Sequence, residues 1–148
     1  MANTKPFVVV ATSCEKILTE KDGVCSLIRI VDTYHIPDIS PEVPPDAQMP
    51  FQALIVLKSG DLKGQFEVGL QIRKPDGTIS QQNPKWPILL NGGEHGANVL
   101  LTFALPPSIL GLYWIDVLWG DEVLTSFPVK LAKQQQTVAD QPDTSSPK

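Results

Sequence analysis

The sequence predicts an all-β fold: an antiparallel, immunoglobulin-like β-sandwich of seven or eight strands. Short runs of apolar and β-branched residues alternate with turn signals along the chain. Near the C-terminal end, Gly120-Asp121 separates two strand-like runs and is typical of a two-residue hairpin turn. No segment keeps the apolar period of an amphipathic helix. The number of strands alone does not distinguish a sandwich from an up-and-down β-barrel, so a β-barrel is the alternative.

Each predicted strand is an apolar run that ends at a turn or at prolines. The connections expected between them are a charged segment at 13–23 with an optional helical turn, a proline-rich loop at 37–50, and loops at 59–64 and 91–96. Residues 37–50 hold five of the fourteen prolines and cannot supply a full ladder of donors. The predicted strands are 7–11, 24–36, 51–58, 65–73, 86–90, 97–105, 111–119 and 122–131.

The pattern within three of these strands predicts their surroundings. Residues 24–36 are apolar on both faces, which favours a central position in a sheet. Residues 65–73 alternate strictly, so Phe66, Val68, Leu70 and Ile72 should face the core. Pro128 cannot donate to a ladder and favours an edge position for the last strand.

The chain of 148 residues, 42% of them hydrophobic, suits one folded domain. We expect a flexible N-terminus at 1–5, a single β-sandwich domain at 6–132, and a disordered polar tail at 133–148. The tail lacks the apolar spacing that would offset the entropy of ordering it.

Composition and charge exclude several function classes. A net charge of −4 removes the electrostatic attraction on which most nucleic-acid binding depends. No stretch is apolar enough to span a membrane, and the run 7–11 is too short for the core of a signal peptide. We therefore expect a cytoplasmic protein whose partner is a protein, with no nucleic acid and no membrane. Cys14 and Cys25 are expected to be free thiols there, with a bridge between them as the alternative.

Four segments carry a resemblance to a known family. They are 14–32 (CEKILTEKDGVCSLIRIVD), 57–61 (LKSGD), 94–98 (EHGAN) and 111–117 (GLYWIDV), and they occur in order across most of residues 7–131. The sequence resembles a family of uncharacterised, mostly bacterial, small β-sandwich proteins, a domain of unknown function. The resemblance implies a β-sandwich fold and transfers no activity, ligand or functional residue.

The chain contains no nucleophile elbow, zinc-protease helix motif, phosphate-binding loop or dinucleotide fingerprint. We therefore expect no cofactor and favour a non-catalytic binding or protein-interaction module over an enzyme. Two alternatives stay open: a metal-assisted enzyme with a non-motif site, and a structural or accessory subunit of a larger assembly.

The metal-assisted alternative depends on loops gathering at one end of the sandwich. If the strands simply alternate in direction, the connections 13–23, 59–64, 91–96 and 120–121 share that end. Oxygen ligands from several loops can bind Ca²⁺, but such loops are also polar when they merely face water, and we favour that interpretation. The candidate metal ligands are Asp61, Glu94, His95 and Asp121.

Aromatic side chains provide the other candidate site. Tyr113 and Trp114 are neighbours on one strand and must point to opposite faces. Tyr113 shares its parity with the apolar Ile115 and is assigned to the core, which places Trp114 outside beside Asp116. An exposed tryptophan can contact a partner, although a half-buried cover on the outer face is favoured over that role. The candidate binding residues are Trp114, Asp116, Trp86, Glu94 and His95.

Overall fold

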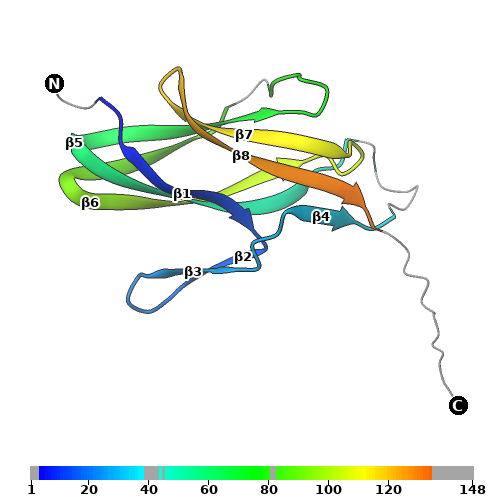
Figure 1. Ribbon diagram of the computed structural model, residues 1–148, viewed down its shortest axis with the longest axis horizontal. Helices are drawn as coiled ribbons and strands as arrows, with labels where there is room; N and C mark the ends of the chain where they lie inside the picture. The colour runs from blue at the N-terminus through cyan, green and yellow to red at the C-terminus, as the bar shows by residue number, and fades with distance from the viewer. Residues whose placement is uncertain (1–3, 39–43, 45, 81–82, 135–148) are drawn as a thin grey trace, which may run out of the picture.

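The fold was analysed in a computed structural model that describes residues 4–38, 44, 46–80 and 83–134 (Figure 1). The described chain contains strands and no helix, so the all-β prediction is confirmed. The predicted disordered tail lies almost entirely outside the described residues. The strands are β1 (Phe7–Cys14), β2 (Lys16–Thr19), β3 (Cys25–Ile28), β4 (Thr33–Ile36), β5 (Met49–Arg73), β6 (Lys85–Leu105), β7 (Gly111–Trp119) and β8 (Glu122–Lys133).

The two longest strands, β5 and β6, pair along most of their length and form a long antiparallel ribbon. Their register runs from the Met49–Leu105 pair to the Gly69–Lys85 pair. The register shifts twice between Lys58 and Lys63, where both strands turn back together at one end of the molecule (Figure 1). Gly60 and its partner Gly93 have φ of 60° and 62° at this bend, a conformation in which a residue with a Cβ would be strained.

The remaining strands extend the ribbon into a curled sheet. The first half of β5 pairs with β1, and its second half pairs with β7, which continues to β8 and then β4. Because the ribbon turns back, the two halves of the sheet face each other across one core. The β4–β8 pair is parallel, and it is the one departure from antiparallel pairing among the described strands.

The core is apolar and aromatic and fills the space between the two halves. Phe51 stacks on Phe103 with ring centroids 5.8 Å apart. The hydroxyl of buried Tyr113 donates a hydrogen bond to the carbonyl oxygen of Ile109 at 2.6 Å, four residues earlier. A tyrosine near the start of a strand, bonded to the backbone just upstream, is also a feature of immunoglobulin-like sandwiches. Leu70 and Val68 are almost fully buried, as the alternation in 65–73 predicts.

The prediction that 24–36 forms one central strand is wrong. The segment divides into β3 and β4, because Arg29 turns the backbone into the left-handed region with φ of 57°. β3 pairs with β2 in a separate two-stranded sheet, so the expected helical turn near Ile17 and Leu18 is also absent there. Val24, Ile28 and Ile30 are exposed, so apolar residues on both faces did not indicate burial here.

Two further expectations are corrected by the pairing. Residues 59–64 and 91–96 lie within β5 and β6 rather than in open loops, because glycines let the ribbon bend while it stays paired. β8 is not an edge strand along its whole length, since β4 pairs with Lys130–Lys133. Pro128 lies just before that paired stretch, where its missing donor breaks no β4 bond.

The ends of the strands place the connections differently from simple alternation. Phe7 at the start of β1 pairs with Lys58 beside the bend, whereas Cys14 pairs with Gln52. The connection after β1 therefore lies at the opposite end from 59–64 and 91–96. The described N-terminal residues lie at the same end as the bend, where the backbone oxygen of Thr4 accepts a hydrogen bond from Trp119 Nε1 at 3.0 Å.

Both cysteines are free thiols: Cys14 is buried and Cys25 is partly exposed on the hairpin. In the part of the chain that the structure describes, no helix has the length and apolar character needed to cross a membrane.

Candidate functional site

A network of hydrogen-bonded polar side chains lies on the outer face of β5, β7 and β8. Register places two rows of side chains across these three strands. One row is Gln71, Asp116 and Ser126, and the next row is Arg73, Trp114 and Pro128. We call these six residues the Arg73–Trp114 face. Their positions follow from strand alternation, because Tyr113 and Ile115 point into the core and Trp114 and Asp116 must point out.

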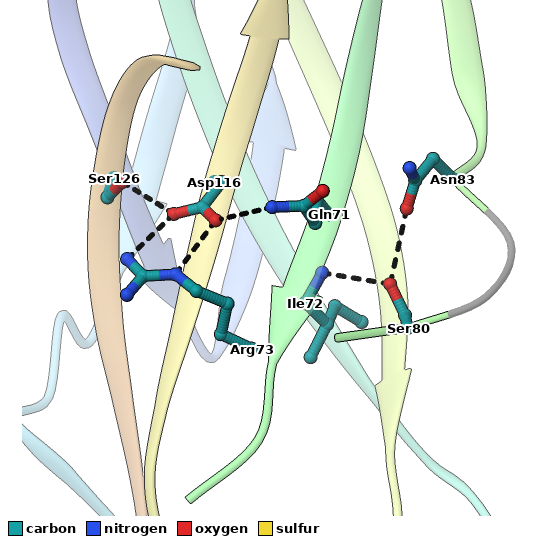
Figure 2. Close-up of polar contacts among 7 residues, drawn as sticks. All are labelled: Gln71, Ile72, Arg73, Ser80, Asn83, Asp116 and Ser126. Carbon is teal, nitrogen blue, oxygen red and sulfur yellow. Dashed lines mark hydrogen bonds and ion pairs between the residues drawn. The ribbon is translucent and has the colours of Figure 1, made fainter. Parts of the chain in front are cut away.

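The carboxylate of Asp116 is the centre of this face (Figure 2). Arg73 donates to it twice, from Nε to Oδ2 and from Nη2 to Oδ1, both at 2.9 Å. Ser126 Oγ donates to Oδ1 at 2.6 Å, and Gln71 Nε2 donates to Oδ2 at 3.0 Å. Asp116 is only 1% exposed although it points away from the core, because these three side chains cover it. A buried carboxylate with four donors is fully satisfied.

These contacts also set the charge state of Asp116. Burial alone would raise the pKa of its carboxyl group, but hydrogen bonds from Arg73, Ser126 and Gln71 outweigh burial and lower the pKa below the ordinary value. The same hydrogen bond raises the pKa of Arg73. Asp116 is therefore an anion at neutral pH, neutralised by its arginine and already fully bonded. Within this face its carboxylate holds the side chains of Arg73, Ser126 and Gln71 in place.

Trp114 extends the network to the surface. The guanidinium carbon of Arg73 lies 5.7 Å from the centroid of the Trp114 ring, within the range of a cation–π contact. Trp114 is 37% exposed, and its register neighbour Pro128 on β8 is exposed as well. Arg73 is thus held by Asp116 and in turn covers one side of the Trp114 ring. The result is an aromatic ring held beside a fixed guanidinium on the outer face of the curled sheet.

Two exposed residues continue the same face along β7 and β8. Leu112, two residues before Trp114, is 41% exposed and pairs with Lys130. Lys130 forms no ion pair with any residue that the structure describes. The surface around Trp114 therefore combines apolar contacts with an uncompensated positive charge.

The structure separates the other residues that the sequence suggested for binding. Trp114 and Asp116 do lie on one outer face, but Trp86 on β6 packs against the core on the opposite face of the sheet. Glu94 and His95 are exposed at the bend of β6. The face therefore contains two of the five suggested residues.

The structure does not gather the candidate metal ligands Asp61, Glu94, His95 and Asp121 into one site. Among the described residues, no three His, Cys, Asp or Glu side chains come together in a group that could hold a metal ion. The three segments that carry these four residues nevertheless lie toward the same end of the molecule. Gly60 pairs with Gly93, which joins the segments of Asp61, Glu94 and His95. The β7–β8 turn, which carries Asp121, lies near them, because the ring centroids of Trp119 before the turn and Phe66 on β5 are 5.1 Å apart.

Sequence reasoning did not find Gln71, Arg73 or Ser126. All three side chains point to the same outer face as Trp114 and Asp116. This orientation identifies a common site only when it is known which strands pair with each other. The pairing of β5 with β7 joins residues 43 and 45 positions apart in the chain. Strand periodicity in a single sequence contains no information about which strand pairs with which.

No protein-family model matches the chain, so the resemblance to a particular family stays a prediction. No curated protein sequence matches it either. Among solved structures, it is similar to an immunoglobulin-like protein from Pseudomonas aeruginosa, with 14% identity and a TM-score of 0.42. That match covers 89% of this chain and all of the other.

Other matches are to parts of larger enzymes. A β-glucosidase from Listeria innocua shows 10% identity and a TM-score of 0.40, covering 85% of this chain and 16% of the enzyme. A β-glucosidase from Kluyveromyces marxianus shows 16% identity and a TM-score of 0.42, covering 75% of this chain and 15% of the enzyme. The chain thus spans about a sixth of the enzymes that it matches, and these likenesses identify no activity.

Proposed function

We propose that the protein is a non-catalytic interaction module that binds a protein partner through the Arg73–Trp114 face. One observation carries this proposal: an exposed tryptophan is held in place by an arginine that is itself fixed to a buried carboxylate. The stability of the sheet does not require this arrangement, because a solvated polar residue at the position of Trp114 would serve stability equally well.

The residue types suit protein recognition. Tryptophan and arginine are enriched among the residues that dominate binding energy at protein interfaces. Association normally loses side-chain entropy, but Arg73 is already fixed by two hydrogen bonds to Asp116 and Trp114 by the contact with Arg73. A face ordered in advance loses less entropy when a partner binds.

The charges favour a different protein over a second copy of this chain. The charge of Arg73 is balanced by Asp116, which leaves Lys130 as the net charge beside Trp114. A two-fold contact would bring the same patch of both copies together and place like charges near each other. An acidic partner surface with an apolar centre would complement both Lys130 and the exposed Leu112 and Trp114.

Site-specific photo-crosslinking tests this proposal in the cell that carries the chain. Leu112 is replaced by a photoreactive phenylalanine derivative, since it is exposed and lies beside Trp114 on the same face. We expect a discrete crosslinked protein from this position. Adding Trp114→Ala should abolish the crosslink.

The matched control carries the same probe at Leu100, an exposed leucine on β6. It should yield no such species. A crosslinked protein that appears equally from both positions, or that survives Trp114→Ala, would contradict the proposal. A crosslink to a second copy of this chain would contradict the proposal of a different, acidic partner and would indicate that the face mediates self-association.

A further inference from the structure

A pocket separate from the Arg73–Trp114 face lies at the base of the β2–β3 hairpin. Its volume is about 600 Å³, and its walls come from the end of β1, the residues after β3, β4, the start of β5 and Thr102 of β6. Sites for small molecules commonly measure roughly 300–1,000 Å³. The pocket is therefore large enough for a small organic ligand, and none of its walls belongs to the face described above.

One side of the pocket is apolar. Met49, Pro50 and Phe51 from the start of β5 line it, together with Val31. Phe51 is 5% exposed and is fixed by an edge-to-face contact with Tyr34, with ring centroids 4.9 Å apart. Phe51 belongs to the packed core and Met49 packs against it, whereas Pro50 is exposed, so this wall offers an apolar surface that is anchored at Phe51.

The other side presents hydrogen-bond donors. Arg29 Nε donates to Glu15 Oε1 at 2.8 Å, and no described residue accepts a hydrogen bond from its two terminal nitrogens. An arginine carries five N–H donors in a planar fork, so four of them stay available for a ligand. Gln52 accepts a hydrogen bond from Ile17 N at its Oε1, and no described residue accepts one from its amide nitrogen.

The backbone fixes Arg29 at this position. It is the one described residue other than glycine with positive φ, at 57°, a conformation that is unfavourable for a side chain with a Cβ. The amide of Glu15 donates to both Ile28 O and Arg29 O at 3.1 Å, and this joins the two ends of the hairpin. Strained residues of this kind occur preferentially at functional sites.

We propose that this pocket binds a small organic anion with an apolar body. The terminal nitrogens of Arg29 hold its carboxylate, sulfonate or similar group in a two-point contact, while Nε stays on Glu15. The apolar body of the ligand lies against Met49, Pro50 and Phe51. A guanidinium can serve two anions at once through its separate edges, so the Glu15 contact need not break.

Fluorescence titration with anilinonaphthalene sulfonate tests this proposal on the full chain, with laurate as a second anion that displaces it. The wild-type protein should bind the dye saturably at one site, and Arg29→Gln should weaken binding by about tenfold or more. Lys21→Gln removes the same charge from the exposed tip of the hairpin and should leave the affinity within about twofold. Circular dichroism of each variant checks that it is folded.

Two further arms locate the site and its chemistry. The neutral dye N-phenylnaphthylamine should bind wild type and Arg29→Gln alike, because it makes only the apolar contacts. Thr102→Trp fills the pocket from an exposed position on β6 and should abolish binding of both dyes. Equal affinity of the sulfonate for wild type and Arg29→Gln, retention of binding in Thr102→Trp, or no saturable binding of either anion would overturn the proposal.

Discussion

Arg73 and Asp116, on neighbouring strands, form a two-point ion pair in which both hydrogen bonds measure 2.9 Å and the carboxylate is almost fully buried. The pair lies on the outer face of the sheet, so it does not stabilise the core directly. It instead joins β5 to β7, while Ser126 joins β7 to β8. The position of Trp114 depends on this network through Arg73.

Removing the carboxylate should destabilise the fold. Asp116→Ala leaves the four donors of three side chains without their acceptor and should lower the free energy of unfolding by about 2–4 kcal/mol. Asp116→Asn keeps the shape and one acceptor oxygen and should cost less. Urea unfolding measures both. Glu67→Ala, an exposed carboxylate on the same face of β5, is the control and should stay within about 0.5 kcal/mol of wild type. Equal losses at the two positions would contradict the assigned role of Asp116.

The same pair predicts how stability depends on pH. The pKa of Asp116 is lower in the folded protein than its ordinary value of 3.8, so the folded state favours the ionised form. The contribution of Asp116 is therefore complete above the unfolded pKa and is lost as the pH falls through the folded pKa. The gap in melting temperature between wild type and Asp116→Asn should be constant near neutral pH and narrow below pH ~4. A gap that widens in acid would show that the pKa is raised instead.

Tyr113 should contribute through its hydroxyl as well as its ring. Burial raises the pKa of Tyr113 to about 12, and its hydroxyl donates to Ile109 O. Tyr113→Phe should cost about 1 kcal/mol, since the ring stays packed and the carbonyl of Ile109 loses its donor. Chemical unfolding measures this cost. Because the folded pKa is raised, the contribution is present below the unfolded pKa and is lost as the pH rises through about 12. No change in stability would mean that the bond is not formed in solution.

Arg29 should tolerate glycine better than a β-branched residue. Glycine adopts φ of 57° without steric cost, whereas valine at this φ is strained. We expect Arg29→Val to destabilise the hairpin by about 1–2 kcal/mol relative to Arg29→Gly. Hydrogen exchange of the β2 and β3 amides reports this locally, even if the rest of the sheet is unaffected. Faster exchange in the glycine variant than in the valine variant would contradict the assigned backbone conformation.

Local sequence patterns predicted most of the strands but not the bend. The alternation in 65–73 and the hairpin around Gly120 are local signals, and both agree with the structure. The sequence at 59–64 and 91–96 predicts two loops, because glycine-rich polar segments normally end strands. Here the two segments pair with each other, and the glycines provide the positive φ for a bend within a continuous ladder. That outcome depends on a pairing between segments distant in the sequence.

The candidate site was predictable only in part, for the same reason. Parity alone placed Trp114 and Asp116 on the outer face. It could not show that Asp116 would be buried, because the side chains that cover it come from β5 and β8. The apolar residues of 24–36 also showed the limit of local patterns, since a strained turn at Arg29 diverts them into an exposed hairpin.

The affinity of the purified partner for variants of this chain tests the central claim most directly. The partner identified by crosslinking is titrated against wild type, Trp114→Ala and Leu100→Ala by calorimetry. A residue that dominates an interface contributes about 2 kcal/mol or more, so Trp114→Ala should raise Kd by about thirtyfold. Leu100→Ala, an equally exposed apolar position on β6, should leave Kd within about twofold. The same Kd for wild type and Trp114→Ala would contradict the assignment of the Arg73–Trp114 face as the binding surface.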